Sequence, residues 1–217
     1  MIAVIGFGAG GHAKVVIEIL RLVSEFEVVG LLDPNAELHA TDVLGVPVLG
    51  DDSLAATLAA RGIRHAFVGV GSSASTCLRR RVFDRARGLG FHIISAVHPS
   101  AVVSPSAVVG AGATIMAGAV VNAAAIFGVD VTVNTGALVE HDCRLGDHVH
   151  VATGARLAGG VTVADGAHVG IGATIRQGVS IGSRSVVGAG AVVIDDVPER
   201  VVVVGVPARV LRRVEDE

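Results

Sequence analysis

An unbroken six-residue repeat is the feature that most constrains how this chain can fold. Every sixth residue from Val103 to Val193 is apolar, and the phase never slips. In a chain that is 51% hydrophobic, sixteen apolar positions in one chosen frame arise by chance about once in 100,000. A six-residue period is typical of a β-helix, in which each hexad makes one short strand and one corner. The pattern therefore predicts a long stack of short parallel strands.

This repeat resembles that of the hexapeptide-repeat family, whose members form left-handed prisms of three hexads, about 18 residues, per coil. The resemblance covers roughly residues 98–196 and implies about five coils. Small or aliphatic residues stand two places before each repeat position, and Cys143 belongs to that series. We therefore expect Cys143 to fill the core and not to act as a nucleophile.

Residues 1–97 follow a different rule, because apolar strands alternate there with stretches of helical spacing. This alternation predicts a small Rossmann-like parallel sheet flanked by helices. The resulting organisation is an α/β domain over 1–97, a left-handed parallel β-helix over 98–198, and a C-terminal tail over 199–217 that packs on the β-helix. The predicted strands are 2–5, 27–33, 65–70 and 92–97, and the predicted helices are 12–23, 51–62 and 76–90.

A glycine-rich loop, "GFGAGGH", follows the first predicted strand and opens the first predicted helix. Gly8, Gly10 and Gly11 allow backbone amides to approach a phosphate at the helix N-terminus. A dinucleotide fold needs a second half, which this short domain lacks, so we expect a nucleotide sugar instead. His12 is expected to contact the sugar or its phosphate. The alternative is that the glycines only make a tight turn.

Asp33 and Pro34 close the second predicted strand. At that place an acid can accept hydrogen bonds from a ribose or a base, so Asp33 is expected to bind the nucleotide. Pro34 is a weaker candidate, since it could merely end the strand. Neither residue distinguishes a GDP-linked from a UDP- or dTDP-linked ligand.

Composition excludes several classes of function. The net charge is −3, and the densest basic cluster, Arg79-Arg80-Arg81, is expected to be a solvated helix face, so we expect no nucleic-acid partner. Two cysteines cannot make a disulfide framework, which favours the cytoplasm. No apolar run approaches the roughly 18 residues that a membrane span needs.

The stretch "EHDC", Glu140 to Cys143, stands out in a region of Val, Ala and Gly. In an 18-residue coil, His141 has Ala123 one coil before it and Gly159 one coil after it. Small neighbours leave space for a substrate beside the imidazole, so this corner is favoured as a functional site. A zinc site built from His141 or His148 with the stacked pair His150 and His168 is the alternative. No acidic ligand spacing supports it, so we expect no metal.

Four segments together resemble the bacterial sugar acetyltransferases of the sialic-acid and bacillosamine pathways. They are "GAGGHAKVV" (8–16), "HPSA" (98–101), "NTGALVEHDCRLGDHVHVATGARLAGGV" (134–161) and "VGVPAR" (204–209). The resemblance implies an acetyl-CoA-dependent N-acetyltransferase acting on the 4-amino group of a nucleotide-linked deoxy sugar similar to GDP-perosamine. The acetylated sugar would serve the synthesis of surface polysaccharide.

The same resemblance implies roles for individual residues. His141 would be the general base, held by Asp142 or Glu140, and the amine would attack acetyl-CoA directly without an acyl-enzyme. CoA contacts map to His150, Gly159 and Ala189, and Asn134 is a weaker candidate for sugar contact. A homotrimer with sites at its subunit interfaces is implied. The alternatives are O-acetylation of a sialic-acid-like sugar, or a non-catalytic scaffold.

Overall fold

The computed structural model describes residues 1–73 and 75–215, and it forms two compact units. The first unit contains residues 1–71 and 78–99, and the second contains residues 72–77 and 100 onward. The short segment 72–77 belongs to the second unit by its contacts. Its Thr76 Oγ1 donates to the carbonyl of Gly166 at 2.9 Å. The last two residues of the predicted tail, 216–217, lie outside the described residues.

The first unit contains the predicted Rossmann-like sheet. Its parallel strands run in the order β4-β2-β1-β5-β6, and β3 pairs antiparallel with β4 at one edge. The central strands β1, β2 and β5 are short and apolar apart from Glu27 and His65, as expected where both faces are covered. The bounds are β1 (Ile2–Phe7), β2 (Phe26–Leu32), β3 (Asp42–Val43), β4 (Val46–Gly50), β5 (His65–Val68) and β6 (His92–Ile93). The predicted strand 92–97 is split into β6 and β7 (Ala96–Val97), and β7 is not part of this sheet.

Helices cover this sheet. α1 (Gly11–Val23) turns Ala13, Val16, Ile17 and Leu20 into the core, and α3 (Cys77–Gly88) buries Phe83 and Ala86. The predicted helix at 51–62 begins as the 3-10 helix η2 (Asp52–Leu54), which Asp51 caps, and continues as α2 (Ala55–Ala60). A second 3-10 helix, η1, spans Ala36–Leu38.

Two features of the first unit differ from the sequence-based prediction. The β3–β4 hairpin was not predicted, because Pro47 interrupts a short stretch and the turn depends on left-handed backbone at Leu44 and Gly45. The expectation that the basic cluster is a solvated face was wrong for Arg79, which is only 2% exposed. Its neighbours Arg80 and Arg81 are exposed, as expected.

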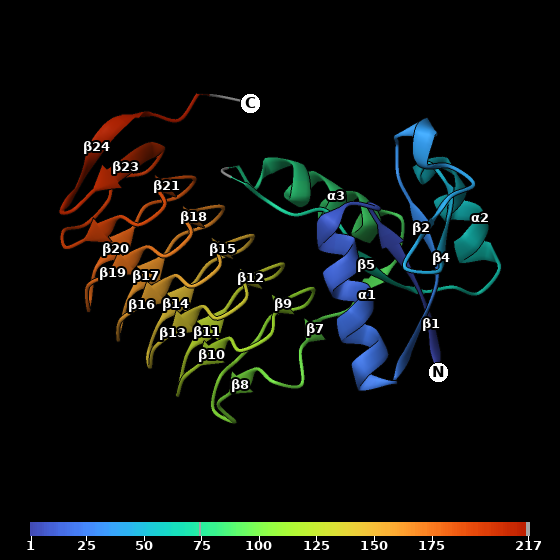
Figure 1. Cartoon of the computed structure of the whole chain (residues 1–217), viewed down its shortest axis with the longest axis horizontal. Helices are drawn as coiled ribbons and strands as arrows, with labels where there is room; N and C mark the ends of the chain where they lie inside the picture. Colours follow the sequence, from blue (N-terminus) through green and yellow to red (C-terminus); the bar gives the residue numbers. More distant parts are fainter. Residues whose placement is uncertain (74, 216–217) are drawn as a thin grey trace. The chain divides into compact units, whose positions relative to one another are not determined.

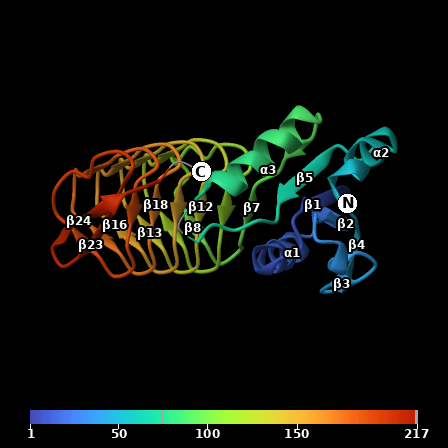
Figure 2. The ribbon, with the colours of Figure 1, turned by 90° about the horizontal axis from the view of Figure 1, so that it is seen from above.

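The second unit is the predicted left-handed parallel β-helix, and each hexad except the one at Val109 supplies a two-residue strand. Val120 pairs with Leu138, which pairs with Arg156, so successive coils are offset by 18 residues. Figures 1 and 2 show these coils stacked in chain order from β8 to β22. The strands are β8 (Val102–Val103), β9 (Thr114–Ile115), β10 (Val120–Val121), β11 (Ile126–Phe127), β12 (Thr132–Val133), β13 (Leu138–Val139), β14 (Arg144–Leu145), β15 (His150–Val151), β16 (Arg156–Leu157), β17 (Thr162–Val163), β18 (His168–Val169), β19 (Thr174–Ile175), β20 (Ser180–Ile181), β21 (Val186–Val187) and β22 (Val192–Val193).

The strands lie in three sheets, one on each side of the prism. One sheet runs β22-β19-β16-β13-β10-β8, and a second runs β11-β14-β17-β20. The third contains β9, β12, β15, β18 and β21, and it continues into β23 (Val201–Gly205) and β24 (Ala208–Arg213). Among the described residues, no helix is both long and apolar enough to cross a bilayer.

The corners of the prism repeat a backbone feature that the sequence only hints at. The residue three places before each repeat position has positive φ from Gly112 to Gly190, and most of these residues are glycines. Only glycine adopts this left-handed conformation without cost. The corner residues that are not glycine are Ala124, Asp130, Asp142, His148 and Arg184.

Candidate active site

The candidate catalytic residues occupy one corner of the β-helix, between β13 and β14. Leu138–Val139 and Arg144–Leu145 bury Val139 and Leu145 in the prism, so the intervening Glu140-His141-Asp142 turn is forced outward. Asp142 occupies the left-handed corner position, with φ 61°. The side chain of His141 remains 59% exposed. A polar turn on a rigid apolar scaffold is a suitable place for a catalytic group.

Asp142 is the acid that contacts the imidazole. Its Oδ2 lies 2.8 Å from His141 Nδ1. Glu140 instead accepts from the side-chain amide of Asn122, one coil earlier, at 2.9 Å, and from the backbone N–H of His141 at 3.4 Å. The choice between the two acids therefore falls to Asp142. Since the carboxylate accepts a hydrogen bond from Nδ1–H, the lone pair of the neutral His141 ring is on Nε2.

The electrostatics of this corner favour a stronger base than a free histidine. The hydrogen bond to Asp142 raises the pKa of His141 above its ordinary value of 6.5, partial burial opposes this, and the negative charges of Asp142 and Glu140 reinforce it. A raised pKa with an accessible Nε2 gives an imidazole that can take up a proton from an attacking group.

Gly159, one coil beyond His141, supports the ring directly. A Cβ placed on Gly159 would lie 2.7 Å from both Cε1 and Nε2 of His141. The space predicted beside the imidazole is thus occupied by the imidazole itself, which leans over the glycine. Gly159 had been predicted as a CoA contact; its observed contact is with the base.

Cys143 is fully buried, as predicted, and its Sγ lies 3.2 Å from the carbonyl oxygen of Ala158. Burial raises the pKa of this thiol. A buried thiol with a raised pKa is a poor nucleophile. Cys143 is therefore a packing residue of the corner.

The other predicted contacts of cosubstrate and sugar lie on a different part of the prism. His150 opens β15 on the third sheet and is buried. Asn134 lies at the corner that follows this sheet, with its Nδ2 3.5 Å from His150 Nε2, and the exposed Ala189 lies at the same corner three coils later. Within one chain, the structure does not bring these residues to the His141 corner.

The predicted stack of His150 on His168 is present, with ring centroids 4.9 Å apart. Burial lowers the pKa of His168 to about 4, so this ring is neutral at physiological pH. His148 Nδ1 lies 3.0 Å from Asp130 Oδ2 in a buried pair. In the part of the chain that the structure describes, no three His, Cys, Asp or Glu side chains are grouped to hold a metal.

The glycine loop of the first unit joins β1 to α1. Gly8 has φ +104°, and a Cβ there would lie 2.8 Å from Val70 Cγ2, so glycine is required for the close approach of the loop to the end of β5. Gly10 and Gly11 have open space where a Cβ would stand. They begin α1, whose first turn carries no acidic residue. Backbone amides with this surrounding suit an anionic group.

Asp33 ties this loop to the end of β2. Its Oδ2 accepts from the backbone N–H of Ala9 at 2.8 Å, and its Oδ1 accepts from that of Asn35 at 2.9 Å. Each carboxylate oxygen has a second lone pair, so a ligand contact is still compatible with these bonds. Pro34 is exposed just after the strand.

Arg79 is the residue of this region that sequence reasoning missed. Its Nη1 lies 2.9 Å from His12 Nε2 and donates to the carbonyl of Val70 at 2.8 Å. It reaches this position from α3 because a one-turn-spaced set of apolar residues, including Phe83 and Ala86, turns the same helix face inward. That spacing was the only available signal.

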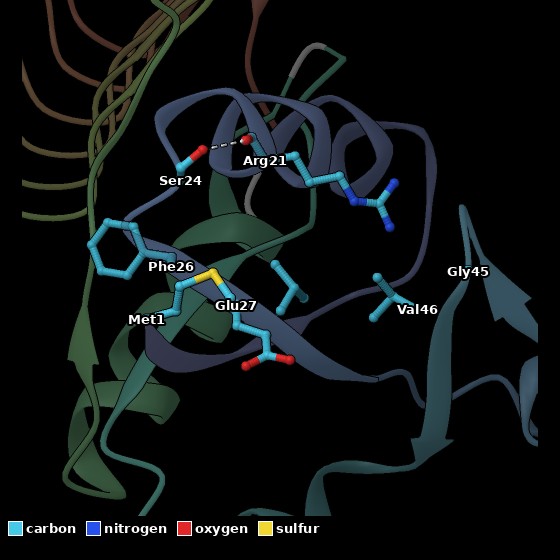
Figure 3. A pocket seen from close by; sticks show the side chains of 8 residues that line it. Met1, Arg21, Ser24, Phe26, Glu27, Gly45 and Val46 are labelled. Carbon is cyan, nitrogen blue, oxygen red and sulfur yellow. Dashed lines mark hydrogen bonds between the residues drawn. The ribbon is translucent and has the colours of Figure 1, made fainter.

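A shallow hollow of the first unit lies at the other end of α1. Figure 3 shows Met1, Arg21, Phe26 and Glu27 around it, beside the C-terminal end of the helix. Ligands of parallel sheets bind at the carboxyl ends of the strands. The hollow is at the opposite edge, so it is not the candidate site.

Comparisons with known proteins agree for both units. A family model described as the PglD N-terminal domain matches residues 2–86. The GDP-perosamine N-acetyltransferase PerB from Caulobacter crescentus, solved with CoA and GDP-perosamine, is 45% identical, with 96% of each chain covered and a TM-score of 0.90. H141A and H141N mutants of that enzyme have been solved in the same complex. No curated protein matches the chain in a sequence search.

Two further solved structures extend the likeness. The acetyltransferase domain of PglB from Neisseria gonorrhoeae, solved also with acetyl coenzyme A, is 36% identical, with 96% of this chain and 99% of that chain covered and a TM-score of 0.88. WeeI from Acinetobacter baumannii is 25% identical, with 97% and 100% covered and a TM-score of 0.83.

Proposed function

Because this chain belongs to the family of hexapeptide-repeat sugar N-acetyltransferases that includes PerB and the PglB acetyltransferase domain, we propose that it transfers acetyl from acetyl-CoA to the 4-amino group of a nucleotide-linked deoxy sugar. The observation that carries this proposal is the exposed His141–Asp142 pair at 2.8 Å on the β-helix. It is supported by the PerB mutants at a histidine of the same number.

The chemistry follows from the orientation of the imidazole. The sugar amine attacks the thioester carbonyl, so a C–N bond forms and the C–S bond breaks. Nε2 of His141 accepts the proton that the nitrogen loses, while Asp142 stabilises the imidazolium. The CoA thiolate leaves and is protonated afterwards. No acyl-enzyme is needed, and the thiol of Cys143 takes no part.

The acceptor is proposed to be bound through its diphosphate by the glycine loop of the first unit. Gly8 permits the tight turn, the amides at Gly10 and Gly11 face open space, and His12 follows them. Asp33 and Pro34 at the end of β2 are the proposed neighbours of the nucleoside. The PglD N-terminal model matches this unit. A GDP-linked sugar similar to GDP-perosamine is the favoured acceptor, since PerB is the relative with 45% identity.

We also propose that the enzyme is a homotrimer whose sites lie between subunits. His141, Asp142 and Gly159 share one corner, whereas Asn134, His150 and Ala189 belong to the third sheet and its following corner. The two groups can form one site where the corner of one copy meets the sheet of another. CoA would then contact His150, Gly159 and Ala189, with His150 or a backbone amide stabilising the oxyanion. The free thiols of Cys77 and Cys143 fit a cytoplasmic location.

O-acetylation of a free sialic-acid-like sugar is the competing function, and it would leave the glycine loop without a ligand. The test is CoA thiol release with acetyl-CoA and matched acceptors: GDP-, UDP- and dTDP-linked 4-amino sugars, the same 4-amino sugars without nucleotide, and a sialic acid. We expect turnover with one nucleotide-linked amino sugar and an amide in the product by mass spectrometry. Turnover only with free sugars, or an ester product, would contradict the proposal.

A further inference from the structure

We propose that Asn122 is a positioning residue of the active site: its side-chain amide holds the Glu140 carboxylate where the negative charge stabilises the imidazolium form of His141. Asn122 thus acts on the catalytic base through Glu140 and does not touch the substrate. The inference rests on the proposed role of His141 as the general base, which the contact with Asp142 supports.

A hydrogen bond links the side chains of Asn122 and Glu140 across two adjacent coils. Asn122 Nδ2 donates to Glu140 Oε2 at 2.9 Å, and both residues are half-buried. A carboxylate only accepts hydrogen bonds, so the amide presents its nitrogen and not its oxygen to Glu140. The backbones are already in register, since the N–H of Asn122 donates to the carbonyl of Val139 at 2.9 Å. Glutamate on a surface samples several rotamers, and this bond selects one of them.

The selected rotamer places the Glu140 carboxylate beside the base. The same oxygen, Oε2, also accepts from the backbone N–H of His141 at 3.4 Å. Asp142 contacts the ring of His141 at Nδ1. The two carboxylates therefore have different tasks: Asp142 orients the imidazole, and Glu140 adds a second fixed negative charge next to it.

Few charged groups face the imidazole of His141. The corner of the coil before it is Asn122-Ala123-Ala124, and the corner of the coil after it is Ala158-Gly159-Gly160, so neither carries a charge. The hydrogen bond to Asp142 is the largest cause of the raised pKa of His141, and the charges of Asp142 and Glu140 add to it. A negative charge held near the ring favours the protonated form, which the base adopts when it takes up the proton of the attacking amine.

Substitutions at the two positions separate the charge of Glu140 from the bond that places it. Asn122→Leu removes the donor at similar volume, and Asn122→Ala removes it without adding apolar bulk. Glu140→Gln keeps an oxygen that can accept from Asn122, but it carries no charge. Ser104→Ala is the matched control, because Ser104 occupies the same corner position one coil before Asn122.

The experiment measures the pKa of His141 by NMR titration of the full-length protein, isotope-labelled at the Cε1 atoms of histidine. The signal of His141 is assigned from its absence in H141N. We expect the pKa of His141 to be lower in N122L, N122A and E140Q than in the wild type, and unchanged in S104A. In the double variant with E140Q, N122L should lower it little further, because the charge that Asn122 places is already gone.

Kinetics give the second readout. The kcat for CoA release should fall about three- to tenfold in N122L, the factor that one ordinary hydrogen bond is worth. The KM for acetyl-CoA should stay within about twofold. The acidic limb of the kcat/KM profile should move to lower pH together with the pKa of His141, and the thermal midpoint of each variant separates these effects from unfolding.

Three results would overturn the inference. An unchanged pKa of His141 in the folded Asn122 variants would mean that Glu140 does not need Asn122. An unchanged pKa in E140Q would mean that the charge of Glu140 does not act on the base. An equal fall on N122L substitution with and without the Glu140 carboxylate would mean that Asn122 acts by another route.

The titration does not depend on turnover, so the two proposals can fail separately. If the pKa of His141 shifts as expected but the wild type acetylates no amino sugar, the proposed function is wrong and the placement of Glu140 by Asn122 is supported. If the wild type acetylates a nucleotide-linked amino sugar but the pKa does not shift in the variants, only the role of Asn122 is wrong.

Discussion

Gly159→Ala separates the position of the catalytic base from the stability of the fold. The added Cβ would lie 2.7 Å from Cε1 and Nε2 of His141, whereas ordinary contact begins at 3.4 Å. The ring must therefore move by about 0.7 Å, because the backbone of Gly159 is held in the coil by its neighbours. Displacements of about 1 Å at a reacting group cost on the order of 100-fold in rate. We expect kcat to fall about 10- to 100-fold.

The free energy of unfolding of the Gly159→Ala variant should rise, although its kcat falls. Gly159 is not among the residues with positive φ, so alanine restricts the unfolded chain without backbone strain and contributes about 0.4–1 kcal/mol. Gly160→Ala is the crossed control. Its φ is +67° with no atom within 4 Å of the new Cβ, so it should lose about 1 kcal/mol of stability and keep its turnover.

The assays are CoA thiol release at saturating substrates and thermal unfolding of the same preparations. A G159A enzyme with wild-type kcat would refute the reasoning, since it would mean that the position of the imidazole over Gly159 does not matter for the reaction. Equal loss of activity in G160A would point to a general disturbance of the corner instead.

Three further predictions follow from the ionisable groups and the core. Loss of activity in acid should follow the protonation of His141. Because Asp142 raises the pKa of His141 above 6.5, kcat/KM should fall as the pH drops through that raised value, and Asp142→Asn should move this acidic limb of the pH profile to lower pH with at least about a tenfold loss of kcat. An acidic limb that does not move would belong to another group. Burial lowers the pKa of His168 from 6.5 in the unfolded chain to about 4 in the folded chain, so the free energy of unfolding should decline by up to about 3 kcal/mol as the pH falls from 6.5 to 4. His168→Val, which copies Val186 one coil later, should make the free energy of unfolding, measured with urea, less dependent on pH over this range. An unchanged pH dependence would contradict the assignment. Cys143→Ala should cost about 1–2 kcal/mol of stability but leave turnover within about twofold; loss of turnover in the folded variant would make the thiol a participant.

The β-helix was predictable because the burial of its apolar side chains repeats every six residues. Each repeat position from Ile115 to Val193 contributes one buried side chain, and a single frame from Val103 to Val193 locates every strand of the prism. The family resemblance added the coil length, which places Gly159 one coil beyond His141. The contact of the imidazole with this glycine was not predicted, because the space was expected to hold a substrate. The left-handed corner residues are a second period of the same sequence. Non-glycine exceptions such as Asp142 mark places where function or packing tolerates the strain.

The first unit was less predictable because its decisive contacts are not periodic. The sequence predicted Arg79 to be one of three solvated arginines, and only the packing of α3 shows that its side chain is buried and contacts His12. The sequence predicted Asp33 as a ligand contact, but it gave no sign that the carboxylate also accepts hydrogen bonds from the backbone amides of Ala9 and Asn35. The family resemblance likewise assigned His141 and His150 to one site, whereas His150 lies on the sheet that contains β15 and His141 lies at the corner between β13 and β14.

The most direct test of the central claim is acetyl transfer by His141→Asn. Asparagine removes the basic nitrogen and leaves the Glu140–Asn122 bond and the coil intact. With the nucleotide-linked amino sugar that the wild type acetylates, CoA release should fall by at least about 100-fold, while calorimetry should find the affinities for acetyl-CoA and the sugar nearly unchanged. Full turnover by the folded H141N protein would contradict the account, because the base would then lie outside the Glu140–Asp142 corner.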